Sequence, residues 1–243
     1  MSKFLTLLLW LLTVTVCQAQ FTDSTNYYAA FTSSGSINKT NDGDAYLLNN
    51  AVKFSIRKKR ISLNTANSWI YGKQDKDLTN NDFSSSLDFN VYHKGRRLFY
   101  WGLANYNTSY SLKINNQLLA GAGVAYNLVD KKNTLLNISD GILYDKSDLY
   151  LNDTTRDVYH TFRNSFRLLL HVSIKGKIIF DGSGFLQNSL LDRPDYIIRT
   201  SSSLSVKLNK WLSFVTSFNY NTVRRTKREN MLLSYGLTLE KYF

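Results

Sequence analysis

Apolar and aromatic residues recur at every second position along most of this chain, and no other feature constrains its fold as strongly. In residues 232–243 one face is apolar and the other is small or polar. The apolar face carries Leu233, Tyr235, Leu237, Leu239 and Phe243, and the other face carries Ser234, Gly236, Thr238 and Glu240. A β-strand points successive side chains to opposite sides of its sheet, so this period predicts strands with two chemically different faces.

The same period divides the chain into twelve strand-like segments. They are predicted at residues 27–38, 45–57, 61–72, 82–93, 97–107, 117–129, 134–145, 157–174, 178–187, 196–208, 211–221 and 232–243. Short turns are centred near residues 59, 95, 131, 176 and 209, and they alternate with long loops near residues 42, 77, 112, 151, 191 and 226. We expect one of the long polar loops at 73–81, and a β-bulge at Asp140-Gly141 because the alternation breaks there.

Alternating short and long connections are typical of barrels that cross the bacterial outer membrane, which have short periplasmic turns and longer extracellular loops. An even number of strands returns both ends of the chain to one side. An open sheet edge cannot persist in lipid, so the sheet must close. We therefore predict an all-β fold, a closed antiparallel transmembrane β-barrel of about 12 strands, formed by residues 20–243 and located in the outer membrane of a Gram-negative bacterium.

The closing strand looks like the final strand of bacterial outer-membrane barrels, which ends the chain on an aromatic residue. From this likeness we expect Leu237, Leu239 and Phe243 to form the membrane-assembly signal read by the barrel-assembly machinery. Lys241 departs from the pattern, since an apolar residue is usual there. With Phe243 in the periplasm, the short basic turns lie on that side, the apolar face of the strand meets lipid and Glu240 points inward. Lys241 must then extend its aliphatic stem along the lipid to reach the interface.

Residues 1–19 have the pattern of a secretory signal peptide. Lys3 is the basic start, residues 4–16 form an apolar run, and Cys17-Gln18-Ala19 is a small-x-small cleavage site. The run is shorter than the ~20 residues that a spanning helix needs, so we expect cleavage after Ala19. Cys17 is the only cysteine in the sequence, and the exported domain is therefore expected to fold without disulfides.

The chain is basic, with a formal net charge of +12. Nucleic acid is the usual partner to consider for such a chain, but the basic residues gather at the turns instead of forming one face. Together with the signal peptide, this distribution predicts no nucleic-acid partner. We expect outer-membrane lipids as partners, with the basic turns either solvated or in contact with anionic head groups. The sequence does not identify a specific protein partner.

The polar faces of the predicted strands give the barrel a net basic interior. The lumen-facing candidates are Lys53, Asp88, Arg163, Arg167, His171, Asp181, Arg199, Lys207 and Glu240. Buried charges need partners, so one hypothesis is an ion-paired plug that fills a closed lumen. Charged linings also set the selectivity of channels, and the alternative is a narrow diffusion pore that favours anions. Twelve strands lie between small filled barrels and wide porins, so strand number leaves both open.

No feature of the sequence predicts a catalytic residue, a cofactor or a metal site, and we expect that the protein is not an enzyme. None of the histidines pairs with another at metal-ligand spacing. Gly121 and Gly123 are not followed by a helix or by Lys-Ser/Thr, so they do not form a phosphate loop; glycines on a barrel strand instead relieve curvature or crowding. A lipid hydrolase at the membrane rim is the remaining alternative, with His160 and either Ser165 or Asp157 as its constellation.

Three stretches carry a resemblance to a known family. They are Ser34-Gly35-Ser36-Ile37-Asn38, Phe99-Tyr100-Trp101-Gly102-Leu103-Ala104-Asn105-Tyr106, and Gly121-Ala122-Gly123-Val124-Ala125-Tyr126-Asn127-Leu128-Val129-Asp130 followed by Leu135. Through them the chain from Gly35 to Phe243 resembles the domain of unknown function 481 family, also described as salt-induced outer membrane proteins. The resemblance implies an outer-membrane barrel and brings no established activity and no catalytic residues.

Our leading hypothesis is therefore an integral outer-membrane barrel without enzymatic activity, with a role in envelope or osmotic stress. Two triplets, Asp23-Ser24-Thr25 and Asp153-Thr154-Thr155, are similar to the short O-glycosylation signal of Bacteroidota, and they add a hypothesis about source and modification.

Overall fold

A computed structural model describes residues 26–40, 43–93, 97–152 and 155–243, with only the backbone of Asn38 included. The predicted signal peptide at 1–19, the triplet at 23–25 and the first two residues of the triplet at 153–155 lie outside the described residues. The described ranges contain no helix that is long and apolar enough to cross a membrane.

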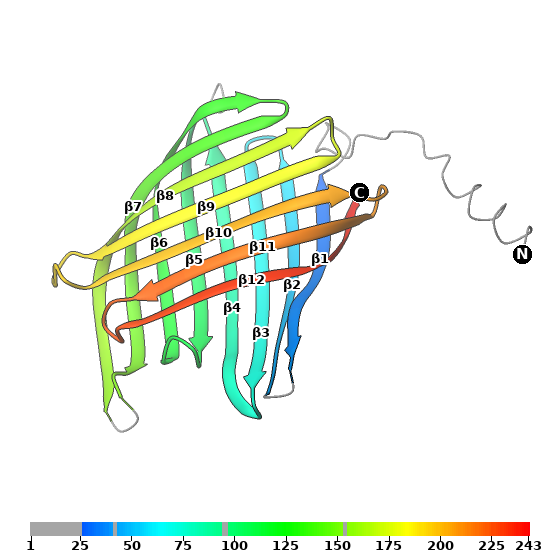
Figure 1. Cartoon of the computed structure of the whole chain (residues 1–243). Helices are drawn as coiled ribbons and strands as arrows, with labels where there is room; N and C mark the ends of the chain where they lie inside the picture. The colour runs from blue at the N-terminus through cyan, green and yellow to red at the C-terminus, as the bar shows by residue number, and fades with distance from the viewer. Residues whose placement is uncertain (1–25, 41–42, 94–96, 153–154) are drawn as a thin grey trace, which may run out of the picture.

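Twelve antiparallel strands form one closed barrel in which each strand pairs with its neighbours in the sequence and β1 pairs with β12 (Figure 1). The strands are β1 (Tyr27–Lys39), β2 (Asp44–Lys58), β3 (Ile61–Gln74), β4 (Asp77–Tyr92), β5 (Leu98–Ser109), β6 (Ile114–Lys131), β7 (Thr134–Tyr150), β8 (Arg156–Ile174), β9 (Ile178–Ser189), β10 (Tyr196–Lys207), β11 (Leu212–Val223) and β12 (Arg228–Tyr242). The predicted all-β barrel of about 12 strands is thus confirmed.

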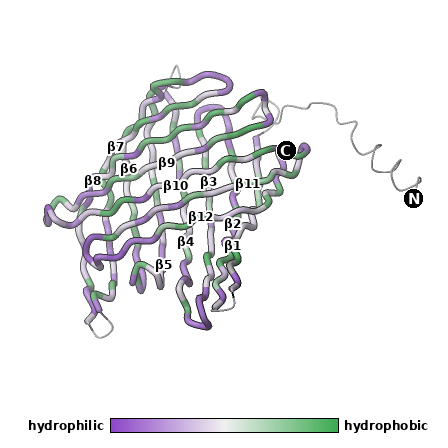
Figure 2. Tube along the Cα trace, viewed as in Figure 1, coloured by the Kyte–Doolittle hydropathy of each residue, from purple (hydrophilic) through white to green (hydrophobic). Residues whose placement is uncertain are grey.

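Hydrophobic and hydrophilic residues alternate along the strands (Figure 2). On β12 the side chains of Leu233, Leu237 and Leu239 are each about half exposed on the outer face, whereas Ser234 is 1% exposed on the inner face. The outer face of β12 is therefore apolar and its inner face polar, as expected for a strand that meets lipid on one side.

The barrel has two ends, which we name by their position relative to the termini. At the near end β1 begins and β12 finishes: the amide of Tyr27 donates to the carbonyl oxygen of Phe243 at 2.9 Å, and the amide of Phe243 donates back at 3.1 Å. The two rings stack with centroids 5.7 Å apart. The far end carries the connections that follow β1, β3, β5, β7, β9 and β11.

The predicted long loop at 73–81 is wrong. Strand β3 continues to Gln74 and β4 begins at Asp77, so only Asp75 and Lys76 make the turn. Both have positive φ, 49° and 75°, as a tight two-residue hairpin turn requires. The strands extend past the apolar band, where water reaches both faces and no alternation is needed. For the same reason, connection lengths do not alternate as strictly as predicted.

The predicted bulge at Asp140-Gly141 is also wrong. The side chains of Asn137, Ser139, Leu143 and Asp145 are all buried in the lumen, so the alternation runs through this stretch without a break. The register of β7 shifts instead against β6, near the two ends of β6, between Ile114 and Asn116 and between Asn127 and Val129.

Candidate functional site

The candidate site is the lumen, and its centre is a buried charge cluster toward the far end. Arg163 on β8 is 0% exposed. Its Nε lies 2.5 Å from Asp145 Oδ2 on β7, and its Nη2 lies 2.8 Å from Asp195 Oδ2 in the β9–β10 loop. Nη2 also donates to the hydroxyl of Tyr159 at 2.9 Å, and that hydroxyl donates to Asp145 Oδ2 at 3.2 Å. Both carboxylates are buried, so the cation and its partners compensate one another out of water.

A second arginine closes the far end above this cluster. Arg225 lies in the β11–β12 loop, and its Nε donates to the same Asp195 Oδ2 at 2.8 Å. Its Nη1 lies 2.7 Å from Asp157 and its Nη2 lies 3.4 Å from Asp192. Its guanidinium stacks 4.0 Å above the centroid of the Tyr159 ring. Burial alone would lower the pKa of Arg225, but its hydrogen bonds to Asp195 and Asp157 raise that pKa above its ordinary value. The loop is therefore held by a permanent cation.

Two further arginines join walls of the barrel that are not neighbours in the sheet. Arg199 on β10 donates from Nη2 to Gln117 Oε1 on β6 at 2.6 Å, and from Nη1 to Asn105 Oδ1 on β5 at 3.3 Å. Arg167 on β8 lies 3.4 Å from Asp88 Oδ2 on β4. Since none of these strand pairs is adjacent in the barrel, each contact crosses the lumen.

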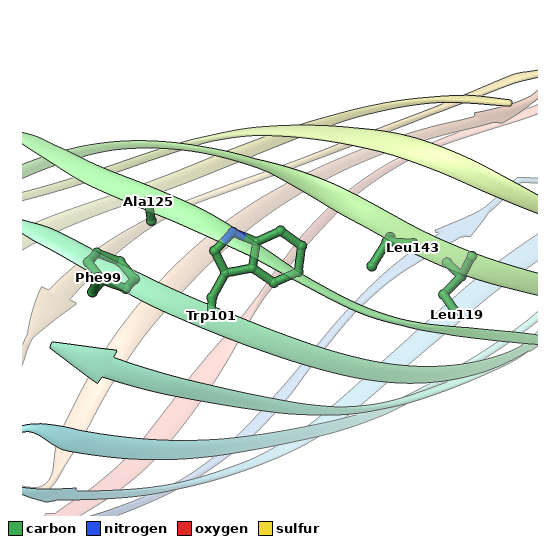
Figure 3. Close-up of a cluster of buried hydrophobic side chains, with 5 residues drawn as sticks. All are labelled: Phe99, Trp101, Leu119, Ala125 and Leu143. Atoms are coloured by element: carbon green, nitrogen blue, oxygen red, sulfur yellow. The ribbon is translucent and has the colours of Figure 1, made fainter. Parts of the chain in front are cut away.

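Apolar side chains fill the space beside these contacts. Toward the far end, one cluster joins the β5–β6 turn to four strands. Its residues are Leu112, Ile114, Leu149, Ile197 and Val223. At mid-barrel, Figure 3 shows the second cluster, composed of Phe99, Trp101, Leu119, Ala125 and Leu143. The Arg167 guanidinium lies 5.6 Å from the Trp101 ring and 5.7 Å from that of Phe185 on β9, so the lumen is packed from β5 to β9.

Two glycines make room for Trp101. A Cβ atom at Gly123 would lie 2.6 Å from Cζ2 of the indole, and one at Gly141 would lie 2.5 Å from it. The indole Nε1 donates to the carbonyl oxygen of Val124 at 3.2 Å, which satisfies its buried polar atom. This geometry agrees with the interpretation that the glycines of β6 relieve crowding.

The near-end half of the lumen is more accessible. The side chains of His171 and Asp181 are 39% and 55% exposed, and their Nδ1 and Oδ1 atoms lie 2.7 Å apart. Lys207 pairs with Glu240 at 2.8 Å, and this pair is largely buried, with side chains 14% and 8% exposed. Lys53 is exposed and pairs in register with Ala30 on β1, which in turn faces Glu240. Solvent therefore enters this half farther than the other.

The lumen-facing candidates fall into two groups. Arg163, Arg167, Arg199 and Asp88 lie in the packed part, and Lys53, His171, Asp181, Lys207 and Glu240 lie toward the near end, where Lys53, His171 and Asp181 are accessible to solvent and the Lys207–Glu240 pair is largely buried. Other residues of the arginine network were not predicted, among them Gln117, Asp145, Tyr159, Asp195 and the arginine Arg225. Parity could have found Gln117 and Asp145, but nothing in the sequence placed the two loop residues in the lumen.

The structure does not bring together the constellation considered for a lipid hydrolase. His160 lies on the outer face of β8, beside the ring of Tyr144 at 6.3 Å, whereas Ser165 is buried on the inner face of the same strand. Asp157 is bound to Arg225 instead. In the part of the chain that the structure describes, no group of three or more His, Cys, Asp or Glu residues could hold a metal ion.

The comparisons with known proteins agree with this architecture. The family model described as "Protein of unknown function, DUF481" matches residues 22–238. The chain belongs to this family. No curated protein matches it. The solved structures that resemble this DUF481 protein include the translocator domain of the autotransporter NalP from Neisseria meningitidis, with a TM-score of 0.53, 10% identity and coverage of 91% of this chain and 90% of that one.

Two other similar structures are channels by their titles. The NanC porin has a TM-score of 0.53 and 10% identity, with coverage of 88% of this chain and 99% of that one. An outer membrane channel from Pseudomonas putida F1 has a TM-score of 0.52 and 8% identity, with coverage of 95% and 100%. At these identities the likeness shows the fold alone. The DUF481 protein therefore has the fold of outer-membrane barrels, a group that includes porins and channels.

Proposed function

We propose that this DUF481 protein is an integral outer-membrane barrel without enzymatic activity whose lumen is closed to diffusion at rest. The observation that carries the proposal is the pair of contacts across the lumen, from Arg199 to Gln117 and from Arg167 to Asp88. A porin that conducts freely keeps an aqueous channel. Here arginines, amides and rings occupy the corresponding space, and the buried Arg163 cluster lies beyond them toward the far end.

The fold supports a location in the outer membrane. In that membrane the near end, with its short turns and Phe243, would face the periplasm, and the far end would face outward. The exported chain would reach the membrane through its signal peptide, residues 1–19. Arg225 and Asp195 would then form a cap on the extracellular side, and the accessible part of the lumen with His171 and Asp181 would face the periplasm.

Osmotic swelling of proteoliposomes tests the closed state. Vesicles with the purified barrel should swell no faster in a small sugar or salt than vesicles without protein. A vesicle population with an open porin serves as the positive control, and heat-modifiable migration on a gel shows that the barrel is folded. Swelling at the rate of the open porin would refute the proposal.

A gated channel for small anions is the second candidate, and Arg199 favours it. Its guanidinium bonds to two neutral amides, so the Arg199 charge is not matched by a bound carboxylate as that of Arg163 is. If the cap were released, this charge would face the opened lumen and attract anions. In a released variant, Arg199→Gln should then abolish the preference for chloride over potassium; unchanged selectivity would contradict this candidate.

A further inference from the structure

The seam between β1 and β12 is only partly closed. The ladder between the two strands runs from Tyr28 and Tyr242 to Gly35 and Tyr235. Beyond this point residues 36–39 of β1 pair with β2 alone, and residues 228–234 of β12 pair with β11 alone. Figure 1 shows the two strands side by side near the C-terminus and diverging away from it. The far-end half of the barrel therefore has two unpaired strand edges.

The divergence follows from contacts that draw β12 away from β1. Asn230 on β12 donates from Nδ2 to Ser111 Oγ in the β5–β6 turn at 2.6 Å. Ser111 donates in turn to Asp82 Oδ2 on β4 at 2.7 Å. Arg225, just before β12, is held by Asp157 and Asp195 as described above. The contacts of Asn230 and Arg225 thus hold the far-end part of β12 away from β1, and the divergence of the two strands is part of the folded arrangement.

Unpaired backbone groups are costly in hydrocarbon and are found in a membrane only where they meet water or another polar space. Residues 36–39 lie level with the end of β3 through their partners on β2, and so they lie at the polar edge of the apolar band and beside a polar space inside the barrel. A hollow of about 260 Å³ lies behind the β1 edge, and its lining residues are Ser36, Ala45, Tyr46, Leu47, Lys73, Gln74, Thr79 and Asn80. Ser36 belongs to the unpaired part of β1, so the hollow is reached directly from the opening.

The lining has an apolar part and a polar part. Leu47 and Tyr46 supply apolar surface, while Gln74 and Asn80 supply amides. Lys73 is the one charged residue of the lining; it is half-buried and makes no ion pair within the described ranges. On the outer face, Ile37 of β1 and Met231 of β12 flank the opening and are 82% and 70% exposed. Apolar side chains thus flank the entrance, and a half-buried lysine lines the hollow behind it.

We propose that the opening between residues 36–39 and 228–234 is a lateral entrance through which an acidic amphiphile, a lipid with a phosphate-bearing head group, enters the hollow from the membrane. The head group would be bound by Lys73, Gln74 and Asn80, and the acyl chain would leave between Ile37 and Met231. In the orientation proposed above, the opening would face the outer leaflet; that assignment rests on the proposed orientation, but the entrance itself does not.

Site-specific photo-crosslinking in defined vesicles tests this entrance. In the test protein, benzoylphenylalanine replaces Gln74, which is exposed and so tolerates a large side chain. In the control protein it replaces Ser201, an exposed residue of β10. Ser201 pairs with Asn219 inside the barrel, away from the seam. After irradiation in phosphatidylcholine with phosphatidylglycerol, mass spectrometry should find phosphatidylglycerol adducts at position 74 and none at position 201. Absence of adducts at 74, or equal adducts at both positions, would overturn the proposal.

The head-group preference has its own test. Lys73→Gln should lower the phosphatidylglycerol adduct at position 74 about fivefold, the effect expected from one lysine that binds an anionic lipid, and should leave the phosphatidylcholine adduct unchanged. An unchanged phosphatidylglycerol adduct would refute the role of Lys73. These measurements report lipid adducts and not solute flux. Their failure would therefore not refute the proposal of a closed lumen, and steady conduction by the barrel would not refute the proposal of a lateral entrance.

Discussion

Arg199 on β10 donates a 2.6 Å hydrogen bond to Gln117 on β6, across the inside of the barrel. Three strands, β7 to β9, lie between them on the shorter route round the sheet, so β6 and β10 are not neighbours. The bond therefore exists only because the lumen is narrow there. Arg167 and Asp88 repeat this arrangement between β8 and β4. Together these contacts are the physical basis of the closed lumen that we propose.

The buried cluster should be the most sensitive part of the lumen to mutation. Arg163→Met leaves Asp145 as an uncompensated buried charge and leaves Asp195 with Arg225 as its only cation, so we expect a loss of about 3–5 kcal/mol in the free energy of unfolding. Urea unfolding in lipid vesicles, followed by tryptophan fluorescence, measures it. Arg193→Met on the exposed β9–β10 loop is the control and should unfold with the wild type. Equal stability of the two variants would contradict the role of Arg163.

Substitution of Arg225 should affect access to the lumen more than it affects the stability of the barrel. Its side chain is 24% exposed and joins the β11–β12 loop to three carboxylates. Arg225→Ala should release the loop and raise the rate of proteoliposome swelling above that of the wild type. The neighbouring exposed Arg224→Ala is the matched control and should not change it. If vesicles with neither variant swell faster than vesicles with the wild-type barrel, the β11–β12 loop is not the cap.

The glycines beneath Trp101 should not tolerate a methyl group. Gly141→Ala would place Cβ 2.5 Å from the indole and 2.7 Å from Gly123 Cα, so the strand or the ring must move. Overpacking of this kind costs about 1–3 kcal/mol of unfolding free energy. Gly184→Ala on the outer face, where no atom lies within 4 Å of the added carbon, is the control. A Gly141→Ala barrel as stable as the Gly184→Ala barrel would contradict the packing described here.

Phe243 should matter for membrane assembly. It stacks on Tyr27 and exchanges two backbone hydrogen bonds with it, so its deletion removes the last pairing of the seam as well as the predicted assembly signal. Heat-modifiable barrel in the membrane fraction should decrease, while the amount of secreted chain should not. Leu191→Ala, which alters an exposed apolar loop residue, should assemble normally. Full insertion after deletion of Phe243 would count against both roles.

Much of the fold could be predicted from the sequence because lipid imposes period two on every strand that crosses it. Arg163 and Arg167 alternate with Phe162, Phe166 and Leu168, and this alone places the arginines inside. The prediction failed where that constraint ends. Residues 73–81 extend beyond the apolar band and carry polar side chains on both faces, so the strands there resembled a loop.

The partners of the arginines were harder to predict. Asp145 was not among the predicted lumen residues. The bulge expected at Asp140-Gly141 would have changed which residues of β7 beyond it face inward. Asp195 and Arg225 lie in loops, where no period exists, and their approach to Arg163 depends on how the loops fold over the lumen. Contacts across the lumen, such as Arg199 with Gln117, depend on the cross-section of the barrel, which strand number alone does not determine.

The current through single barrels in a planar lipid bilayer tests the closed lumen most directly. We predict that the wild-type barrel inserts without steady conductance, and that Arg225→Ala combined with Arg199→Ala opens discrete channels. Steady openings of the wild-type protein, with a conductance unchanged in the double variant, would contradict the closed lumen.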